Sequence, residues 1–388
     1  MKIMYFLHEG GEYFNGASRS ALALIRANAA AGNSNIVVIP AAGGRLEEEL
    51  RRIANTEILV VPSYRWKDFR RERPVSQLYY RLRYLTAGRI LNRVRARRLA
   101  RTARERGVSL VHSNSSVIDL GARTAKYAKL PHIWHFREFG EEDFGMFPYG
   151  SERGFYREVE RLSSAVVCVS EAVKNKLAAH VDEKKLRVIY NGVPLPAKLP
   201  PERERDGTVN VLISGVISEK KGQRTAVEAL HRLSGQGIDN VRLTVAGRGR
   251  AAGLGDCYER VSDRVRLSGF CDDMAGLRKT MDIELMCSVS EAFGRTVVEA
   301  MAAGLIIIGA AAGAAPELID NGVTGFLFPP GDAEALAERI LAAMRLDEAE
   351  LAAMRERAYA SVCEKFSESR YTGEVLALYH ELISRETI

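Results

Sequence analysis

The sequence has 388 residues, of which 46% are hydrophobic and 27% are charged, and its formal net charge is +7. These proportions are typical of globular proteins, and the length exceeds what one hydrophobic core usually organises, so we expect two domains. No apolar run approaches the roughly 18 residues of a membrane-spanning helix, because the longest one, Leu305 to Ala315, contains Gly309 and Gly313. The composition therefore argues against a helical membrane protein and predicts a soluble one.

The N-terminal segment Lys2 to Leu7 is predicted to be a first buried strand and not part of a signal peptide. Its apolar run stops at His8-Glu9, and no small-residue cleavage site follows. The five cysteines lie mostly in apolar surroundings without a paired metal spacing, which is typical of reduced, packed thiols. We therefore expect a cytoplasmic protein.

A polar, glycine-rich turn from His8 to Ser18 follows this strand, and a helical pattern then runs to about Ala31. Strand, glycine loop and helix open a Rossmann-like unit, but this loop lacks the G-x-G-x-x-G spacing, so no dinucleotide cofactor is indicated. Further strand patterns recur at Ile36 to Ile39, Glu57 to Val61, Leu110 to His112, His132 to Trp134 and Ala165 to Val169. Strands alternating with helices predict a parallel sheet covered on both faces.

The region from Arg65 to Arg106 is strongly basic, because its many arginines face only Asp68, Glu72 and Glu105 as acids. Aromatic and aliphatic residues are interleaved with the arginines. A basic helical surface with aromatics favours peripheral contact with an anionic membrane, here the inner face of the cell membrane. The alternative, a helix pair that packs one apolar face on its own domain, stays open. No recognition motif accompanies the charge, so nucleic acid is not an expected partner.

Polar residues follow three of the predicted strands. They are His112-Ser113-Asn114, His135-Arg137-Glu138 and Ser170-Glu171. Ligands of open parallel sheets gather at the carboxyl ends of the strands, which makes these residues candidates for ligand contact. Ser170-Glu171 precedes a helix and is explained as an N-cap. His135 is favoured as a functional histidine because of its strand-end position, and Arg137, Glu138 and Asn114 are further candidates.

The proline-rich stretch Pro194 to Gly207 makes a poor helix or strand interior, so we place the domain boundary there, between residues 195 and 196. Val209 to Ser214 then opens a second strand pattern, with a turn from Gly215 to Gly222. Asp272-Asp273 is interpreted as a helix-start pair, and no clustered ligands indicate a metal. Towards the C-terminus the sequence predicts helices at 334–346, 349–365 and 371–384.

The stretch EAFGRTVVEAMAA, from Glu291 to Ala303, is the strongest chemical signal. Its apolar spacing predicts a helix with Glu299 in the first turn. Backbone N–H groups at a helix start carry partial positive charge, so Gly294 to Thr296 are candidates to hold a phosphate and Glu299 to accept hydrogen bonds from hydroxyls. Thr296 with Glu299 also fits a capping box, and this alternative stays open. Glu291 serves no capping role.

The form E-x-F-G-x-x-x-x-E-A-M-A-x-G, from Glu291 to Gly304, resembles the signature of the retaining, GT-B-fold glycosyltransferases of family 4 (glycosyl transferases group 1). GAAPE at 313–317 and NGVTGFLFPPGD at 321–332 are similar to the same family, and the resemblance covers nearly the whole chain. It implies an α/β fold of the GT-B type, with two Rossmann-like domains facing a central cleft. Residues 1–195 would form the acceptor-side domain and 196–388 the nucleotide-sugar domain, with the last helix packing back on the first.

The resemblance implies a metal-independent enzyme without a cofactor, which moves a hexose-type sugar from a nucleotide-diphosphate sugar to an acceptor hydroxyl with retention. Lys221 and the amides of Gly294 to Thr296 would hold the diphosphate. Glu299 would bind the ribose hydroxyls and Glu291 the transferred sugar, which His135 would support from the other domain. The further donor-side candidates are Gly16, Gly215, Phe293, Arg295 and Thr296, and the acceptor-side candidates are Arg137, Glu138 and Asn114.

Val216 departs from the family pattern, because it stands where an arginine is expected directly after Gly215. Removing one cation from the diphosphate could cost roughly a few kcal/mol in the transition state. Lys220, Arg248 and Arg295 are candidates to compensate, with Arg295 the best placed. The preferred acceptor is a carbohydrate or lipid-linked glycan of cell-surface polysaccharide or glycolipid synthesis. Two alternatives stay open: a sugar-nucleotide epimerase of the same fold, and a catalytically silent membrane- or anion-binding protein.

Overall fold

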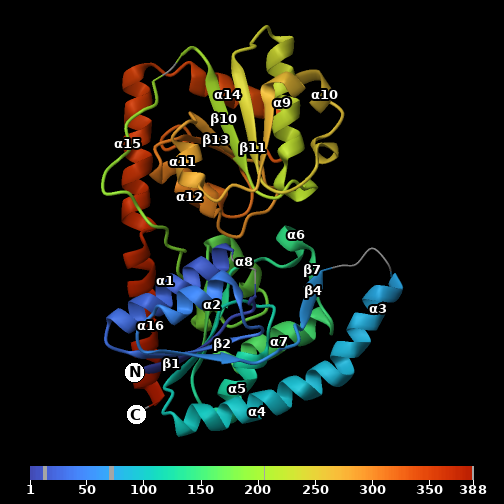
Figure 1. Cartoon of the computed structure of the whole chain (residues 1–388), viewed down its shortest axis with the longest axis vertical. Helices are drawn as coiled ribbons and strands as arrows, with labels where there is room; N and C mark the ends of the chain where they lie inside the picture. Colours follow the sequence, from blue (N-terminus) through green and yellow to red (C-terminus); the bar gives the residue numbers. More distant parts are fainter. Residues whose placement is uncertain (12–14, 70–73, 205, 387–388) are drawn as a thin grey trace. The chain divides into compact units, whose positions relative to one another are not determined.

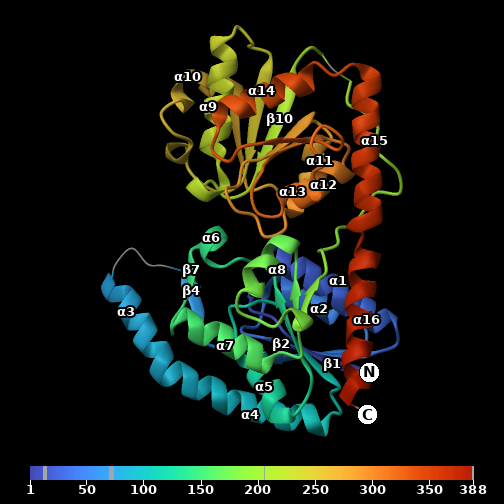
Figure 2. The same cartoon turned by 180° about the vertical axis from the view of Figure 1, so that it is seen from behind.

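The computed structural model of the chain describes residues 1–11, 15–69, 74–204 and 206–386. The chain divides into two compact units, one made of Met1–Gly192 with Glu368–Ile388 and the other of Val193–Ser367 (Figures 1 and 2). Parts of the predicted glycine loop (12–14), basic region (70–73) and second domain (205 and 387–388) lie outside the described residues. Within the described ranges, no helix is both long and apolar enough to cross a membrane.

The first unit is built on a seven-stranded parallel sheet with the strand order β3-β2-β1-β5-β6-β8-β9. Its strands are β1 (Lys2–Phe6), β2 (Ser34–Ile39), β3 (Thr56–Val60), β5 (Leu110–Ser113), β6 (His132–Phe136), β8 (Ala165–Cys168) and β9 (Leu186–Val188). Its helices are α1 (Gly16–Ala30), α2 (Gly44–Arg51), α3 (Pro74–Arg83), α4 (Arg89–Glu105), α5 (Leu120–Ala128), α6 (Glu141–Phe144), α7 (Glu152–Leu162), α8 (Glu171–Ala178) and α16 (Glu368–Glu386). The predicted alternation of strands and helices therefore produces the predicted parallel sheet.

Side chains of β1 alternate between the two faces of this sheet. Ile3 and Tyr5 pack in a core with α1, α2 and α16, whereas Met4 and Phe6 pack in a core with α4 and α5. Both views show α16 lying beside α1, which it contacts (Figures 1 and 2). Because helices cover both faces, residues 3–6 of β1 are all apolar and do not alternate with polar residues.

The basic region contains a short strand and a π-helical segment that its sequence pattern did not predict. A short strand, β4 (Lys67–Phe69), pairs antiparallel with β7 (Met146–Pro148) outside the main sheet. Five π-helical residues, Tyr84–Gly88, join α3 to α4. Ala96, Leu99, Ala100 and Ala103 of α4 pack on the sheet, so the packing alternative holds for this helix. The membrane contact stays a prediction.

The second unit is built on a six-stranded parallel sheet with the order β12-β11-β10-β13-β14-β15. Its strands are β10 (Val209–Ser214), β11 (Val241–Ala246), β12 (Val265–Gly269), β13 (Ile283–Met286), β14 (Ile306–Ala310) and β15 (Phe326–Phe328). Its helices are α9 (Gln223–Gly235), α10 (Tyr258–Val261), α11 (Met274–Arg278), α12 (Arg295–Ala302), α13 (Ala315–Leu318), α14 (Ala333–Met344) and α15 (Glu348–Lys365). Val211 and Ile213 of β10 pack in a core with α9, α14 and α15.

Three histidines lie in the core strands β5 and β6 of the first unit. His112, His132 and His135 are at most 1% exposed. Burial lowers the pKa of His132 to about 3, although a hydrogen bond between its Nδ1 and the Leu162 carbonyl (3.0 Å) acts in the opposite direction. Burial and the charge of Arg137 place the pKa of His112 and of His135 well below the usual value. The folded unit therefore holds three neutral imidazoles at physiological pH.

We predict that acid destabilises the first unit through these histidines. Their pKa values are lowered on folding, so their contribution is complete above the unfolded pKa of roughly 6.5 and falls as pH drops below it, because only the unfolded chain takes up protons. Each should add about 1.4 kcal/mol per pH unit to the slope of the unfolding free energy. Urea unfolding at several pH values between neutral and mildly acidic would measure that slope, since both tryptophans, Trp66 and Trp134, report on this unit. His132→Gln should lower this slope by about 1.4 kcal/mol per pH unit. An unchanged slope would contradict the prediction that buried, neutral His132 contributes to it.

Candidate functional site

The segment from Glu291 to Glu299 forms a loop after β13 and the first turn of α12. The helix begins at Arg295, and its N-cap is Gly294, whose φ of 87° lies in the left-handed region that glycine adopts at little cost. No described side chain caps this helix, so the alternative of a capping box formed by Thr296 and Glu299 is wrong. The first N–H groups of a helix lack intrahelical partners, and here they lie at the loop that carries Glu291.

Lys221 and Glu291, which are 70 residues apart in sequence, form an ion pair with 2.7 Å between Nζ and Oε2. Lys221 lies in the turn after β10, and Glu291 in the loop after β13, the parallel neighbour of β10. Gly222 allows the two loops to approach, since a Cβ on it would lie 2.3 Å from the Cys287 carbonyl oxygen. The structure therefore brings two predicted site residues together at one edge of the sheet.

Glu299 is held by two arginines. Arg278 donates from Nη1 to Oε2 of Glu299 (2.9 Å), and Arg295 donates from Nε to Oε1 (2.8 Å). The Nε of Arg278 also donates to Glu284 (2.7 Å), a carboxylate of β13 that is fully buried. Burial by itself would lower the pKa of Arg278, but the charges of Glu284 and Glu299 raise it, so the guanidinium stays charged. Glu299 is thereby fixed as an oriented carboxylate.

Gly215 and Val216 form the turn directly after β10. The side chain of Gln223 donates from Nε2 to the carbonyl oxygens of Gly215 (3.3 Å) and Val216 (3.2 Å), which fixes the turn. The Val216 side chain is 60% exposed. Arg248 lies beside this turn, because its carbonyl accepts from the Ile217 N–H (2.8 Å). A cation could therefore stand at position 216 without burial, and the backbone of Arg248 lies beside this position.

Phe293 occupies a different place from the one expected for a donor contact. Its side chain is only 4% exposed and packs edge-on against Phe366, with 5.9 Å between the ring centroids. The aromatic ring therefore stabilises the loop from inside. Any contact with a ligand would have to come from the backbone of this residue.

Arg137 joins the predicted first-unit residues. Its Nε donates to Oδ1 of Asn114 (2.8 Å), and Nη2 donates to the Tyr371 hydroxyl of α16 (2.8 Å) and lies 3.4 Å from Nδ1 of His135. Nη1 donates to Asn191, a partner that the sequence analysis did not identify. The ends of β5, β6 and β9 and the start of α16 are thus tied together by one guanidinium.

His135 and Glu138 are more deeply placed than the sequence suggested. Strand β6 continues to Phe136, so His135 lies inside it and is 0% exposed, and its Nε2 has no hydrogen-bond partner among the described residues. Glu138 is 6% exposed, and its Oε1 accepts from the Ser116 N–H (2.8 Å) and from the hydroxyls of Ser115 (2.9 Å) and Ser116 (2.6 Å). The carboxylate of Glu138 therefore holds the loop after β5 from inside, and its role on the acceptor side stays a prediction.

Gly16 and Asp273 both lie at helix starts, and Gly16 stays a predicted donor-side residue. Gly16 is the exposed first residue of α1, whose N-cap Asn15 accepts from the N–H groups of Ala17 and Ser18. Asp273 caps α11 by accepting from the Gly276 N–H (2.8 Å), as the helix-start interpretation predicts. Within the described residues, no group of three or more His, Cys, Asp or Glu side chains is placed to hold a metal.

Sequence reasoning missed Arg278 and Glu284. Glu284 is a charged residue in the middle of the short apolar strand IELM. A buried charge needs a partner, so this position was the available signal for a buried cation. The sequence could not say which arginine supplies it.

Two family models match the chain, one on each half. "Glycosyltransferase Family 4" matches residues 14–196, and "Glycosyl transferases group 1" matches residues 197–361. Among relatives, the chain is 34% identical over 123 residues to the N-acetyl-alpha-D-glucosaminyl L-malate synthase of Bacillus anthracis, a match that covers 32% of each protein. The chain thus spans about a third of that relative's length.

Solved structures resemble nearly the whole chain. A glycosyltransferase from Rickettsia africae is 22% identical with a TM-score of 0.76, and covers 98% of both chains. The Anabaena protein Alr3699/HepE, solved in complex with UDP and glucose, is 20% identical with a TM-score of 0.73, and covers 98% of this chain and 100% of its own. These likenesses confirm the predicted α/β fold with two Rossmann-like units.

We predict that Arg278→Met destabilises the second unit by about 3–5 kcal/mol, because it leaves the Glu284 carboxylate buried without its cation. Arg278→Met combined with Glu284→Leu should recover much of that loss. Arg232→Met serves as a control, since Arg232 forms only an exposed pair with Glu334 (3.4 Å), which is worth at most about 1 kcal/mol. Hydrogen exchange of the β10 and β13 amides would measure the differences. Equal effects of Arg278→Met and Arg232→Met would contradict the prediction.

Proposed function

Because the chain belongs to the group 1 glycosyltransferases of family 4, we propose that it transfers a hexose-type sugar from a nucleotide-diphosphate sugar to an acceptor hydroxyl with retention of configuration. The observation that carries the proposal is the meeting of the Lys221–Glu291 pair with the start of α12, at the carboxyl ends of β10 and β13. Open parallel sheets bind their ligands at this edge.

The donor diphosphate is assigned to the amino end of α12 and to Lys221. The first-turn amides of Gly294 to Thr296 point outward from the helix and carry partial positive charge. The ammonium of Lys221 has three donors, so it can bind a phosphate oxygen while it keeps its bond to Glu291. These groups stabilise the charge of the departing diphosphate without a metal ion.

Glu299 and Glu291 are assigned to hydroxyl groups of the donor. Each oxygen of Glu299 takes one arginine, which leaves further lone pairs to accept from the two ribose hydroxyls. The pair with Lys221 aims the carboxylate of Glu291 at the sugar that follows the diphosphate. In this proposal both carboxylates position the donor, and the leaving phosphate accepts the proton of the incoming hydroxyl.

On the first unit, we assign the acceptor side to Arg137 and Asn114 and the transferred sugar to His135. The lowered pKa of His135 keeps its imidazole neutral, so it would act as a hydrogen-bond partner and not as a cation. Its complete burial means that this role requires local movement around Arg137 when substrates bind. The acceptor proposed is a carbohydrate or lipid-linked glycan of cell-surface polysaccharide synthesis.

The charges of the described donor-site pairs are balanced. Lys221 faces Glu291, and Arg278 and Arg295 face Glu284 and Glu299. A diphosphate would therefore meet little surplus positive charge from these pairs, and Val216 takes the place of a further cation. Arg248 is the candidate to supply that charge. Its guanidinium lies over the ring of Phe270, with 5.1 Å between Cζ and the ring centroid.

We expect one nucleotide-diphosphate sugar from a panel of UDP, GDP, ADP and TDP donors to stabilise the protein. At a hundredfold excess over Kd the gain should be about 2.7 kcal/mol, which corresponds to a thermal shift of roughly 5–10 °C. Glu299→Ala should abolish the shift, whereas Glu338→Ala, an exposed glutamate of the same unit, should preserve it. If no donor shifts the parent protein, the donor site is misassigned and a silent binding protein becomes the better description.

Val216→Arg should raise kcat/KM for the donor by at least about tenfold, because it adds an unpaired cation beside the diphosphate. Lys221→Ala should lower turnover by roughly a hundredfold or more. Val323→Arg, which adds the same charge elsewhere on this unit, serves as the control. Steady-state kinetics with the donor from the panel would measure all three. An unchanged rate for Val216→Arg, together with a loss for Arg248→Ala, would show that Arg248 already supplies the charge.

A further inference from the structure

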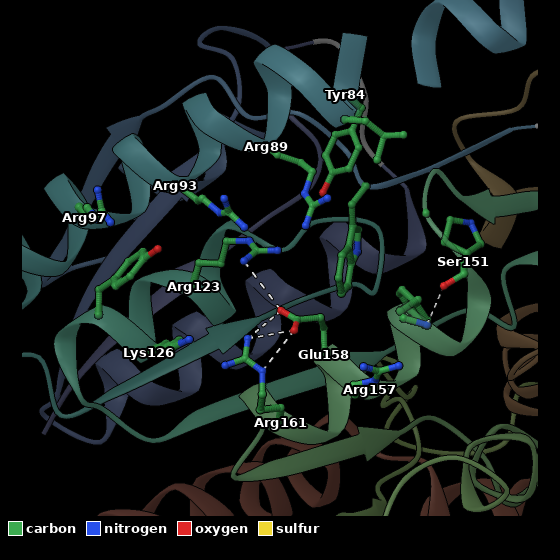
Figure 3. A pocket seen from close by; sticks show the side chains of 17 residues that line it. Tyr84, Arg89, Arg93, Arg97, Arg123, Lys126, Ser151, Arg157, Glu158 and Arg161 are labelled. Carbon is green, nitrogen blue, oxygen red and sulfur yellow. Dashed lines mark hydrogen bonds and ion pairs between the residues drawn. The ribbon is translucent and has the colours of Figure 1, made fainter. Parts of the chain in front are cut away.

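A cavity of about 590 Å³ lies wholly within the first unit, between α4, α5 and α7 (Figure 3). Helix α4 contributes Arg89, Arg93 and Arg97, which lie on one face because they are four residues apart. The other two helices add four more cations, and Glu158 is the single carboxylate among the lining residues. Figure 3 shows these side chains facing the cavity from several sides. The donor site proposed above is made of other residues, in the second unit.

One arginine of the cavity is held rigidly from behind. The Nε of Arg123 donates to the fully buried carboxylate of Asp119 (2.5 Å), which also accepts from Asn92 (2.9 Å) and from the Tyr84 hydroxyl (3.4 Å). The side chain of Arg123 is only 10% exposed. Its guanidinium is therefore a fixed cation in the cavity wall and loses little rotational freedom when a ligand binds.

The one lining carboxylate is already occupied. Arg161 binds Glu158 through Nη2 (2.8 and 3.0 Å) and Nε (3.2 Å), and Nη1 of Arg123 lies 3.8 Å away. Burial acts to raise the pKa of Glu158, but Arg161, together with the charges of Arg123 and Lys126, outweighs burial and lowers the pKa. Glu158 therefore stays charged, and as a single carboxylate it cannot neutralise the seven cations that line the cavity.

Five of the seven lining cations form no ion pair with a described residue. They are Arg89, Arg93, Arg97, Lys126 and Arg157, and among them Lys126 acts on Glu158 only through its charge. They come from three helices around one concave space, so their repulsion is relieved most by an anion in the middle.

We propose that this cavity binds a phosphate or diphosphate ester. Tetrahedral phosphate oxygens accept hydrogen bonds in several directions, which suits arginines that converge from separate helices, whereas one planar carboxylate would neutralise too few of them. The volume fits a small molecule or a headgroup. The rings of Trp66, Tyr84 and Phe155 also line the cavity and are at most 6% exposed, so they offer an apolar wall for the rest of the ester.

The phosphate can come from a lipid headgroup or from a soluble compound. Ile90, Leu91 and Val94 on α4 are 61%, 37% and 39% exposed and lie next in sequence to the cavity arginines Arg89 and Arg93. These apolar side chains would contact the chain of a lipid-borne diphosphate, and a soluble ester would leave them in water. The inference does not depend on the donor chemistry of the second unit, so the two can fail separately.

The test is titration of the full-length protein with inorganic pyrophosphate, followed by tryptophan fluorescence. Both tryptophans report on this unit, since Trp66 lines the cavity and stacks on Trp134 (5.2 Å). Arg93→Glu combined with Arg97→Glu should weaken binding at least about tenfold, because charged hydrogen bonds are lost. Arg98→Glu with Arg101→Glu changes the charge of the same helix equally, at exposed positions outside the cavity, and should leave binding unchanged.

Absence of pyrophosphate binding, or equal weakening by the two double variants, would overturn the proposal. Sedimentation with neutral phosphatidylcholine vesicles, with and without a polyprenyl diphosphate, distinguishes the sources. Binding that needs the diphosphate lipid and is lost only with the cavity variant supports a lipid headgroup, whereas pyrophosphate binding without vesicle binding supports a soluble ester. If phosphatidylglycerol vesicles or a single-stranded oligonucleotide bind and both double variants weaken them equally, the cations form a general polyanion surface and the proposal falls.

Discussion

A buried carboxylate in the middle of a core strand is a constraint on which the structure of the second unit depends. Glu284 lies in β13, is fully buried, and accepts from the Ser214 hydroxyl of the neighbouring strand (2.8 Å) as well as from Arg278. A buried carboxylate is tolerated only when a cation is buried beside it. Arg278 meets that need and extends one nitrogen to Glu299. The burial of Glu284 thus depends on one guanidinium, which together with Arg295 also orients the proposed ribose-binding carboxylate.

A second guanidinium has a comparable position in the first unit. Arg137 connects the loops after β5 and β9 with β6 and with Tyr371 of α16. The C-terminal helix is therefore joined to this unit by a polar contact as well as by its apolar face in the core. The neutral histidines beside Arg137 avoid a build-up of charge, because their burial keeps them unprotonated next to a fixed cation.

The two units use positive charge in different ways. In the second unit the described arginines and Lys221 at the proposed donor site are matched by carboxylates, so they position groups more than they attract anions. In the first unit the cations of α4, α5 and α7 surround a cavity with one carboxylate. Part of the positive charge behind the net charge of +7 is therefore clustered around this cavity. A concentrated positive surface of this kind attracts multivalent anions more strongly than the same charge spread evenly.

Local sequence patterns predicted the alternation of strands and helices and the motif that carries Glu291, Gly294 and Glu299. Each of these depends on hydrophobic spacing, turn residues or a helix start within a few positions of the chain. The tertiary structure alone decided that Lys221 meets Glu291, that Arg278 serves Glu284 and Glu299, and that His135 and Glu138 are enclosed. It also decided that arginines of three helices surround one cavity. These features join residues that are distant in sequence, and which of many arginines reaches a given partner is fixed only when the sheet sets the positions of its loops and helices.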